Sequence, residues 1–387
     1  MNVEEVAAQA VAWRRHLHAH PELSFQEHET ASFVRETLES FGGLEIDCLT
    51  PTSVVARLRS GQPGPTLALR ADIDALPIQE ESGVDFASET QGVMHACGHD
   101  GHTAILLAVA RSLGARRAEL TGEVRFLFQH AEEVPPGGAT ELVAAGALDG
   151  VDAVLGGHLI STLEVGKVAA LDGACTASAD TFSIRIHGRG GHAAFPHKTV
   201  DPIAVSAQAI SNLQHVVSRS TSPLDRVVIS VTRIAGGTAD NVIPETTELG
   251  GTVRTYHQEV REHTRELIAR VLEGVTAAHG ATYEFEYLEG YAPVVNDPRL
   301  SAVVREVAGA DRVADFEPLM AGDDFSAYLG VAPGCFFFIG AGDDRAFPHH
   351  HPRFTIDERA LPVGIETLAG AAMRLLGTDA ESEPVMD

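Results

Sequence analysis

The chain has 387 residues, of which 44% are hydrophobic, and a formal net charge of -26. At roughly 150 residues per domain this length predicts two or three domains, and the composition is typical of a folded globular protein with a large core. A strongly negative surface disfavours nucleic acid and anionic membranes as partners, because both would meet like charge. Small molecules are therefore the favoured ligands.

The sequence contains no pattern typical of a secretion signal or a membrane span. The N-terminus lacks a basic segment followed by an apolar core, and no uninterrupted apolar run approaches the ~18 residues that cross a bilayer. Four cysteines, Cys48, Cys97, Cys175 and Cys335, are too widely separated for a dense disulfide framework. We therefore expect a cytoplasmic protein in which Cys97 is free to act as a thiolate ligand.

Helices alternate with apolar strands along most of the chain. Helices are predicted over 4–18, 26–40, 103–115, 139–146 and 360–376. Buried strands are predicted over 53–59, 65–71, 124–128, 151–155 and 335–339. This alternation favours an α/β fold in which helices cover a largely buried sheet.

Residues 180–289 follow a different plan. The predicted order is strand 181–187, helix 200–218, strand 226–234, strand 246–255, helix 258–279 and strand 282–289. This β-α-β-β-α-β order is the ferredoxin-like arrangement. Because metal-type residues occur both before and after it, we predict a domain at 179–289 inserted into a catalytic domain formed by 1–178 and 290–387.

The segment 95–102 concentrates side chains that bind metals. It holds three histidines, Cys97 and Asp100, and thiolate and imidazole are preferred ligands of zinc and its transition-metal neighbours. In an extended segment Cys97 and His99 would project the same way, whereas Asp100 would point opposite to His99. The alternative is a polar loop with chance histidines, since the sequence holds 19 of them.

Three further polar groups each follow a predicted buried strand. They are the pair Glu132 and Glu133, the single His158, and the Pro-His-His-His-Pro run at 348–352. Ligands of open α/β sheets bind beyond the carboxyl ends of strands, where one carboxylate can hold a metal and its neighbour can transfer a proton. Singly, these groups have simpler explanations as surface glutamates, a core histidine and a surface loop. Their shared location favours one common site.

Seven motifs spread along nearly the whole chain carry a family resemblance. They lie at 16–25, 69–77, 95–102, 131–133, 188–194, 240–244 and 350–354. As a set they resemble the two-metal aminoacylase and carboxypeptidase family of metallopeptidases. The most similar branch comprises the hippurate hydrolases, the N-acyl-amino-acid amidohydrolases and the plant auxin-conjugate hydrolases. The resemblance implies hydrolysis of the amide bond of an N-acyl amino acid, such as an N-acetyl or N-benzoyl derivative, to a carboxylic acid and a free amino acid.

The same resemblance implies a catalytic site with two divalent metal ions per subunit, Zn²⁺ or Mn²⁺. The implied metal ligands are Cys97, His99, Glu133, His158 and His350, with Cys97 bridging the two ions. Glu132 is the implied general base. It would take a proton from a metal-activated water and return it to the leaving amine.

Three residues of the inserted domain receive roles from the resemblance. His192 is implied to stabilise the tetrahedral oxyanion, reaching across a homodimer formed through this domain, which would act as a lid and dimerisation domain. Asn241 and Arg254 match positions that hold the free carboxylate of the substrate, and arginine suits this role because of its two-pronged donor geometry. Alternatively, Asn241 is a turn residue and Arg254 a charge on a strand surface.

Four further polar residues are predicted to support the site. Asp72 stands where other branches carry a metal-binding histidine, so Asp72 and Asp74 are either orienting residues or structural turn carboxylates. Asp100 and His102 are interpreted as supporting residues and not as ligands.

Two departures from the family pattern concern substrate preference. His130 occupies a position where relatives usually have proline, and Asp323 replaces a glutamate. Two alternative functions remain: a dipeptidase or carboxypeptidase of the same family, and a non-catalytic metal-containing binding protein. The binding protein would most naturally have lost the base or a ligand, and this chain retains all of them.

Overall fold

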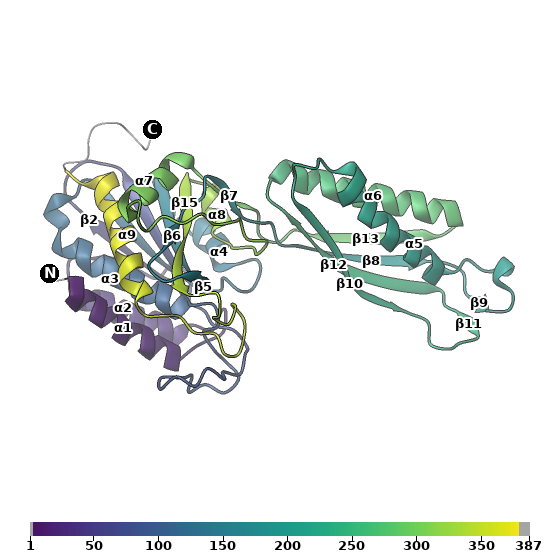
Figure 1. The fold of residues 1–387 in the computed structure, drawn as a ribbon, viewed down its shortest axis with the longest axis horizontal. Helices are drawn as coiled ribbons and strands as arrows, with labels where there is room; N and C mark the ends of the chain where they lie inside the picture. Colours follow the sequence, from purple (N-terminus) through teal and green to yellow (C-terminus); the bar gives the residue numbers. More distant parts are fainter. Residues whose placement is uncertain (1–2, 379–387) are drawn as a thin grey trace. The chain divides into compact units, whose positions relative to one another are not determined.

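The computed structural model describes residues 3–378 and divides the chain into two compact units, each described here by itself (Figure 1). The first unit contains the residues up to Cys175, Val295–Glu317 and the residues from Asp324 onward. The second unit contains Thr176–Val294 and Pro318–Asp323. The short segment Pro318–Asp323 therefore groups with the second unit, although the sequence analysis assigned it to 290–387. The catalytic and lid roles of the units stay predictions.

A seven-stranded sheet with the order β1-β2-β4-β3-β5-β15-β6 forms the centre of the first unit. Its strands are β1 (Glu45–Asp47), β2 (Val54–Arg59), β3 (Thr66–Asp72), β4 (Glu123–Gln129), β5 (Ala153–Glu164), β6 (Val168–Ala169) and β15 (Gly334–Gly342). Strand β3 pairs in parallel with β4 and β5, and β5 pairs in parallel with β15. The carboxyl ends of these four strands therefore lie at one edge of the sheet, where ligand sites of α/β folds form.

Helices pack against this sheet and against one another. They are α1 (Val3–Ala19), α2 (His28–Phe41), α3 (His99–Ala115), α4 (Gly138–Ala144), α7 (Pro298–Ala308), α8 (Ser326–Leu329) and α9 (Ala360–Leu376). Helix α3 is buried along nearly its whole length and packs against α1 and α9 (Figure 1). The sequence of α3 is rich in alanine, leucine and valine on all sides, and a helix of this kind is buried in a core. The predicted α/β fold is confirmed.

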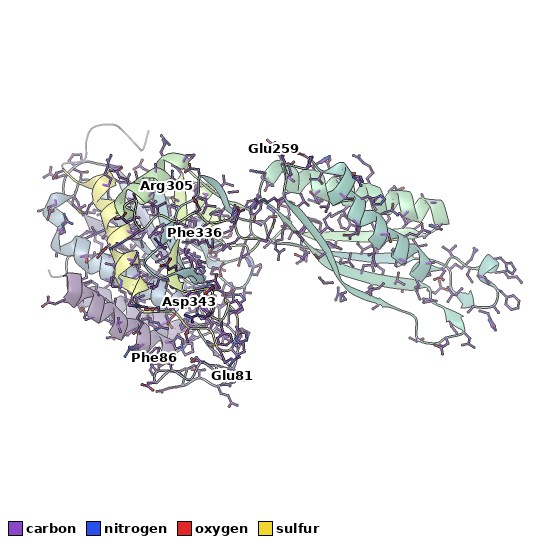
Figure 2. The ribbon with its side chains drawn as sticks, viewed as in Figure 1. Glu81, Phe86, Glu259, Arg305, Phe336 and Asp343 are labelled. Atoms are coloured by element: carbon purple, nitrogen blue, oxygen red, sulfur yellow. The ribbon has the colours of Figure 1, made fainter. Side chains whose placement is uncertain are left out.

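Beneath α3 the core is formed by apolar side chains of the sheet. Phe126 of β4 and Leu155 of β5 are completely buried. Phe336 of β15 is only 1% exposed and lies among the side chains of the first unit (Figure 2). No helix within residues 3–378 is long and apolar enough to cross a membrane.

The second unit has the ferredoxin-like topology predicted for residues 180–289. Its elements are β8 (Asp180–His187), α5 (Pro202–His215), β10 (Val227–Gly236), β12 (Thr246–Thr255), α6 (Gln258–His279) and β13 (Thr282–Leu288). The strand order β10-β12-β8-β13 is antiparallel throughout. Along β8 the side chains of Phe182, Ile184 and Ile186 are buried, and the residues between them are not, so one face of the sheet packs against the helices. A small two-stranded sheet pairs β9 (Gly191–His192) with β11 (Val242–Ile243).

The helix predicted over 103–115 begins four residues earlier than expected. Gly98 has a φ of +89°, a left-handed conformation that glycine adopts without strain, and α3 starts at the next residue, His99. The extended geometry assumed for Cys97 and His99 is therefore wrong, because His99 and Asp100 already belong to the first turn of the helix.

The strand predicted over 151–155 continues to Glu164, so His158 lies within β5 and not beyond its end. Gly156 and Gly157 lie inside this strand. A Cβ atom at Gly156 would lie 2.8 Å from the ring of Phe325, and one at Gly157 would lie 3.0 Å from Ile339. The two glycines therefore allow close packing inside a continuous strand.

Candidate metal centre

Three soft ligand atoms of the first unit converge where α3 begins. Cys97, His99 and His158 present donor atoms that all lie within 4.8 Å of one another. Cys97 precedes α3, His99 is the first residue of that helix, and His158 comes from β5. The sulfur of Cys97 lies 3.6 Å from Nε2 of His158. One thiolate and two imidazoles suit zinc and its transition-metal neighbours.

A second donor group shares the same thiolate. Cys97, Glu133 and His350 also present ligand atoms within 4.8 Å of one another. Glu133 follows β4, and His350 lies between β15 and α9, where its side chain is 52% exposed and its Nε2 is 3.3 Å from Oε1 of Glu133. The two donor groups therefore have the sulfur of Cys97 in common. Five side chains from distant parts of the chain are thus brought together.

The hydrogen bonds of two histidines leave one nitrogen of each ring for a cation. Nδ1 of His99 donates to the backbone oxygen of Asp74 at 3.0 Å, and Nδ1 of His158 donates to the oxygen of Leu159 at 2.9 Å. Each ring therefore keeps a lone pair on Nε2. Among the described residues, Nε2 of His99 and Oε1 of Glu133 are buried and make no hydrogen bond, although Oε1 of Glu133 lies 3.3 Å from Nε2 of His350. Buried polar atoms without a hydrogen bond cost roughly 1–3 kcal/mol each, and metal ions bound at the two donor groups would satisfy them.

The local charges also favour a cation. Burial lowers the pKa of His99, but the neighbouring carboxylates, Asp72 foremost, outweigh burial and raise that pKa to about 10. The field at Nε2 of His99 therefore stabilises positive charge there. His158 behaves differently: burial, reinforced by His102 and His349, lowers its pKa well below the usual range and keeps the imidazole neutral, as a metal ligand must be.

His102 is a supporting residue and offers no free nitrogen. Its Nδ1 donates to Oδ1 of Asp72 at 2.6 Å, and its Nε2 accepts the N–H of Leu159 at 2.8 Å. Oδ2 of Asp72 also accepts a hydrogen bond from the guanidinium of Arg70 at 2.7 Å. Burial raises the pKa of Asp72, yet the positive charges around it, chiefly Arg70, hold that pKa well below its usual range. Asp72 and His102 therefore orient the site, although both lie close enough to His99 to be considered as ligands.

Asp100 serves the packing of helices. It is buried and accepts hydrogen bonds from Arg14 and His18 of α1, each at 2.9 Å. Because it lies on the first turn of α3, it links α1 to the helix that carries His99. Its position in this cluster of metal-type residues reflects structure and not ligation.

Glu132 lies beside the donor groups. It is 7% exposed, and its carboxylate shares with His99 and Glu133 a group of ligand atoms within 4.8 Å of one another. The backbone N–H of Glu133 donates to Oδ2 of Asp74 at 3.1 Å. The residue before Glu132 is Ala131, with a φ of +49°. A left-handed residue therefore turns the chain at the end of β4, just before the two carboxylates.

His349 contacts the site, although the sequence pattern did not predict it as a ligand. Its Nδ1 lies 3.6 Å from the sulfur of Cys97, and its Nε2 accepts the N–H of Ser161 at 3.4 Å. This leaves the ring proton on Nδ1, directed at the sulfur, where it stabilises a thiolate. The signal in the sequence was the run of three histidines at 349–351, which does not by itself distinguish between its members.

The three residues predicted in the inserted domain do not all come together within the second unit. His192 pairs with Val242 across β9 and β11, and the N–H of Ala193 donates to the oxygen of Asn241 at 3.0 Å. His192 and Asn241 are therefore neighbours. They lie past the end of β8 at which His187 pairs with Thr246.

Arg254 lies toward the opposite end of this sheet. Its neighbour Val253 pairs with Asp180, the first residue of β8. The guanidinium of Arg254 donates to the oxygen of Val253 at 3.0 Å, to that of Asp180 at 3.3 Å and to the hydroxyl of Thr252. Burial lowers its pKa. Seven residues of β12 lie between Arg254 and Thr246, which pairs with His187 at the other end of β8.

Comparisons with known proteins show the family of this chain. Residues 68–374 match the model of peptidase family M20/M25/M40. The chain belongs to this family. The membership confirms the predicted relationship to metallopeptidases of the aminoacylase and carboxypeptidase type.

Individual relatives cover most of the chain. An N-acyl-L-amino acid amidohydrolase of Geobacillus stearothermophilus is 56% identical over 301 residues, which are 77% of this chain and 81% of the relative. Thermostable carboxypeptidase 2 of Saccharolobus solfataricus is 39% identical over 370 residues, which are 94% of each protein. The crystal structure of a dinuclear metal binding peptidase of the M20 family from Bacillus subtilis matches with a TM-score of 0.87 at 40% identity, and covers 96% of this chain and 99% of that one.

Proposed function

We propose that this chain is a metal-dependent amidohydrolase that cleaves the amide bond of N-acyl amino acids to a carboxylic acid and a free amino acid. The observation that carries the proposal is the pair of donor groups that share Cys97, with the Glu132 carboxylate beside them. The 56% identical N-acyl-L-amino acid amidohydrolase supports this substrate class. The 40% identical dinuclear metal binding peptidase supports a two-metal site.

The proposed cofactor is a pair of divalent ions, Zn²⁺ or Mn²⁺. Their proposed ligands are Cys97, His99, Glu133, His158 and His350. When bound, the ions supply Lewis-acid chemistry: they lower the pKa of the attacking water and polarise the amide carbonyl. This assignment is supported by Nε2 of His99 and Oε1 of Glu133, two buried atoms that make no hydrogen bond within the described residues.

Glu132 is the proposed general base. Its carboxylate takes a proton from the attacking water while the water oxygen forms a bond to the amide carbon. The same carboxyl then gives that proton to the amide nitrogen as the carbon–nitrogen bond breaks, so the amino acid leaves as a neutral amine. One residue thus serves both proton transfers, and it returns to its ionised form at the end of the cycle.

For the second unit we propose that His192 donates a hydrogen bond to the oxyanion and that Asn241 and Arg254 bind the carboxylate of the substrate. The separation of Arg254 from the other two along the sheet favours contributions from two subunits of a homodimer. Exposed apolar side chains near the end of the sheet that carries His192 support an interface there. They are Phe195 at 50%, Ile234 at 58% and Val242 at 51% exposure.

A single assay separates the candidate functions. The protein is offered N-acetyl and N-benzoyl amino acids beside free dipeptides, with and without a chelator, and acid release and amine release are measured. We expect turnover of the N-acyl amino acids, loss of turnover with chelator, and recovery when Zn²⁺ or Mn²⁺ is added back. Preferred cleavage of dipeptides would instead support a peptidase, the second candidate that the 39% identical carboxypeptidase favours. No hydrolysis by metal-loaded protein would support a binding protein.

A further inference from the structure

Glu27 is a buried carboxylate that the proposed mechanism does not use. It immediately precedes α2 and has no exposed surface. Its Oε1 accepts two backbone N–H groups, one from Phe25 at 3.0 Å and one from Ala131 at 2.8 Å. Burying a carboxylate is costly unless hydrogen bonds compensate, so this side chain is held in place by what it binds. One of these two N–H groups belongs to Ala131, the residue directly before Glu132.

Both backbone segments that Glu27 holds are in a left-handed conformation. The φ angles are +65° at Phe25 and +49° at Ala131. A residue other than glycine adopts this region only at an energetic cost, which surrounding contacts must offset. The ring of Phe25 also meets the ring of His130 edge-on, with centroids 5.6 Å apart. The loop 24–27 and the segment 130–133 thus stabilise each other's unusual backbone.

A second buried carboxylate holds the chain on the other side of Glu132. Oδ2 of Asp74 accepts the N–H of Glu133 at 3.1 Å and the hydroxyl of Ser24 at 2.7 Å. Ser24 belongs to the same loop as Glu27. The N–H groups of the residues immediately before and after Glu132 are therefore both bound by buried carboxylates, and Glu132 itself lies between two fixed points.

We propose that Glu27 is a positioning residue for the general base. By binding the N–H of Ala131 it holds the left-handed turn at the end of β4 and so sets the direction in which the Glu132 side chain leaves the backbone. The proposal rests on the proposed function, in which Glu132 is the base. Proton transfer depends on placement, since a displacement of about 1 Å can cost about 100-fold in rate.

The test compares substitutions at Glu27 that keep or remove the acceptor oxygen. Glu27→Ala removes it, and we expect kcat to fall about 10- to 100-fold, with little change in KM and with the metal-to-protein ratio of the wild type. Glu27→Gln retains an oxygen for both N–H groups and should keep kcat within about threefold of wild type. If Glu27→Ala does not fold, Glu27→Met, which keeps the length of the side chain without an acceptor, takes its place.

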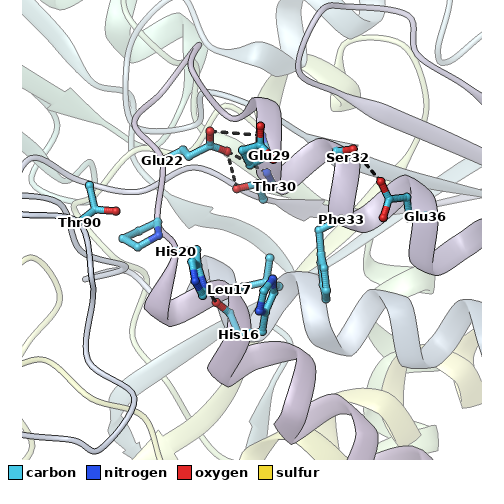
Figure 3. A pocket seen from close by; sticks show the side chains of 11 residues that line it. His16, Leu17, His20, Glu22, Glu29, Thr30, Ser32, Phe33, Glu36 and Thr90 are labelled. Carbon is cyan, nitrogen blue, oxygen red and sulfur yellow. Dashed lines mark hydrogen bonds between the residues drawn. The ribbon is translucent and has the colours of Figure 1, made fainter.

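Glu22 provides a matched control at the same helix. Its carboxylate accepts the N–H and the hydroxyl of Thr30, at 2.8 and 2.9 Å, and the N–H of Glu29 at 3.2 Å (Figure 3). Glu22→Ala should therefore lower the thermal unfolding midpoint through α2 and leave kcat at the wild-type level. A loss of kcat in this control equal to that of Glu27→Ala would reduce the role of Glu27 to general stability and overturn the proposal.

A double-mutant cycle links Glu27 to Glu132. Because Glu27 acts through the base, Glu27→Ala should cause no further loss of kcat in a Glu132→Gln background. Independent, multiplicative losses would contradict the proposal, as would wild-type kcat in Glu27→Ala or equal defects in the Ala and Gln variants. Full turnover of Glu132→Gln alone would instead refute the proposed base, so the two failures are distinguishable.

Discussion

The hydrogen bonds of the histidine rings near Cys97 determine which ring nitrogens are available to a metal. His99 and His158 donate through Nδ1 to backbone oxygens and keep Nε2 as a lone pair. His102 uses both of its nitrogens, one on Asp72 and one on the N–H of Leu159. Five imidazoles lie at or beside this site, counting His349 and His350, and the hydrogen-bond partners of each ring determine which nitrogens can bind a metal. Hydrogen bonding therefore distinguishes the proposed ligands from chemically equivalent neighbours.

The role of Glu132 predicts a variant that binds metal without turnover. Glu132→Gln removes the proton acceptor, so kcat should fall by at least about 100-fold, while the ligand set is unchanged. The measurement is kcat with an N-acyl amino acid, accompanied by elemental analysis of the metal-to-protein ratio. Full activity in this variant would remove Glu132 from its role, and loss of metal would show that it is a ligand.

Replacing Cys97 should weaken metal binding at both proposed metal positions. Because its sulfur belongs to both donor groups, Cys97→Ala should lower the metal-to-protein ratio by more than one ion per chain. The exposed Cys48 is the matched control, and Cys48→Ala should retain the wild-type ratio. An unchanged metal content in Cys97→Ala, measured by elemental analysis after dialysis, would contradict ligation.

At the scale of helices and strands, a buried ion network fastens α1 to the start of α3. Arg14 and His18 lie one turn apart on α1, and both bind Oδ2 of Asp100. Nε2 of His18 also lies within hydrogen-bond distance of Oε1 of Glu80, at 3.1 Å. The guanidinium of Arg14 also donates a hydrogen bond to Oε1 of Glu358 at 3.1 Å. The first turn of α3 contains both Asp100 and His99, so this network also holds His99, a proposed ligand, in position.

This network predicts a loss of stability at alkaline pH. Burial lowers the pKa of His18, but Asp100 and Glu80 outweigh burial and raise that pKa to about 9. A folded pKa above the usual 6.5 stabilises the fold below about pH 6.5, and this contribution, on the order of 3 kcal/mol, is lost as the pH rises through 9. We expect the free energy of unfolding to fall more between pH 6.5 and 9.5 in wild type than in His18→Gln.

The exposed His28 on α2 supplies the control for this comparison. His28→Gln should keep the pH dependence of the wild type, measured by urea unfolding at each pH. If the free energy of unfolding changed with pH by the same amount in wild type and His18→Gln, the network would not depend on a protonated His18.

At the scale of the whole molecule, the metal-type residues and the residues proposed to bind substrate belong to different units. The first unit contains both donor groups and Glu132. The second contains His192 and Asn241 toward one end of its sheet and Arg254 toward the other. Exposed apolar residues near the end that carries His192 lead to the proposal that a second copy of the chain covers them.

A charge placed on this surface should separate the proposed dimer. Ile234 of β10 is 58% exposed, and Ile234→Arg should convert a dimer into monomers, because the arginine would have to be buried in the interface. Val331, 51% exposed in the first unit, is the control, and Val331→Arg should remain dimeric. Sedimentation velocity measures the outcome. A wild type that is monomeric at micromolar concentration would contradict the proposal, and so would a dimeric Ile234→Arg.

Local sequence patterns predicted where helices and strands occur, but they were less accurate about where α3 begins and where β5 ends. Period-two alternation located β8, and apolar periodicity located α9, because both patterns depend on residues close in sequence. The prediction ended β5 before Gly156 and Gly157, but both glycines lie inside the strand, where they pack closely against Phe325 and Ile339. The sequence shows that a residue is glycine, but not what lies opposite it.

The sequence by itself determined the family of folds, the order of the elements and the set of side chains able to bind a metal, because periodicity and residue type are local properties. Only the tertiary structure decided which of those side chains have a free lone pair, that His349 touches Cys97, and that Glu27 holds Ala131. These facts depend on pairs of residues separated by 252 and 104 positions in the chain. Such pairs meet only after packing has brought distant segments together, and a single sequence carries no local sign of that meeting.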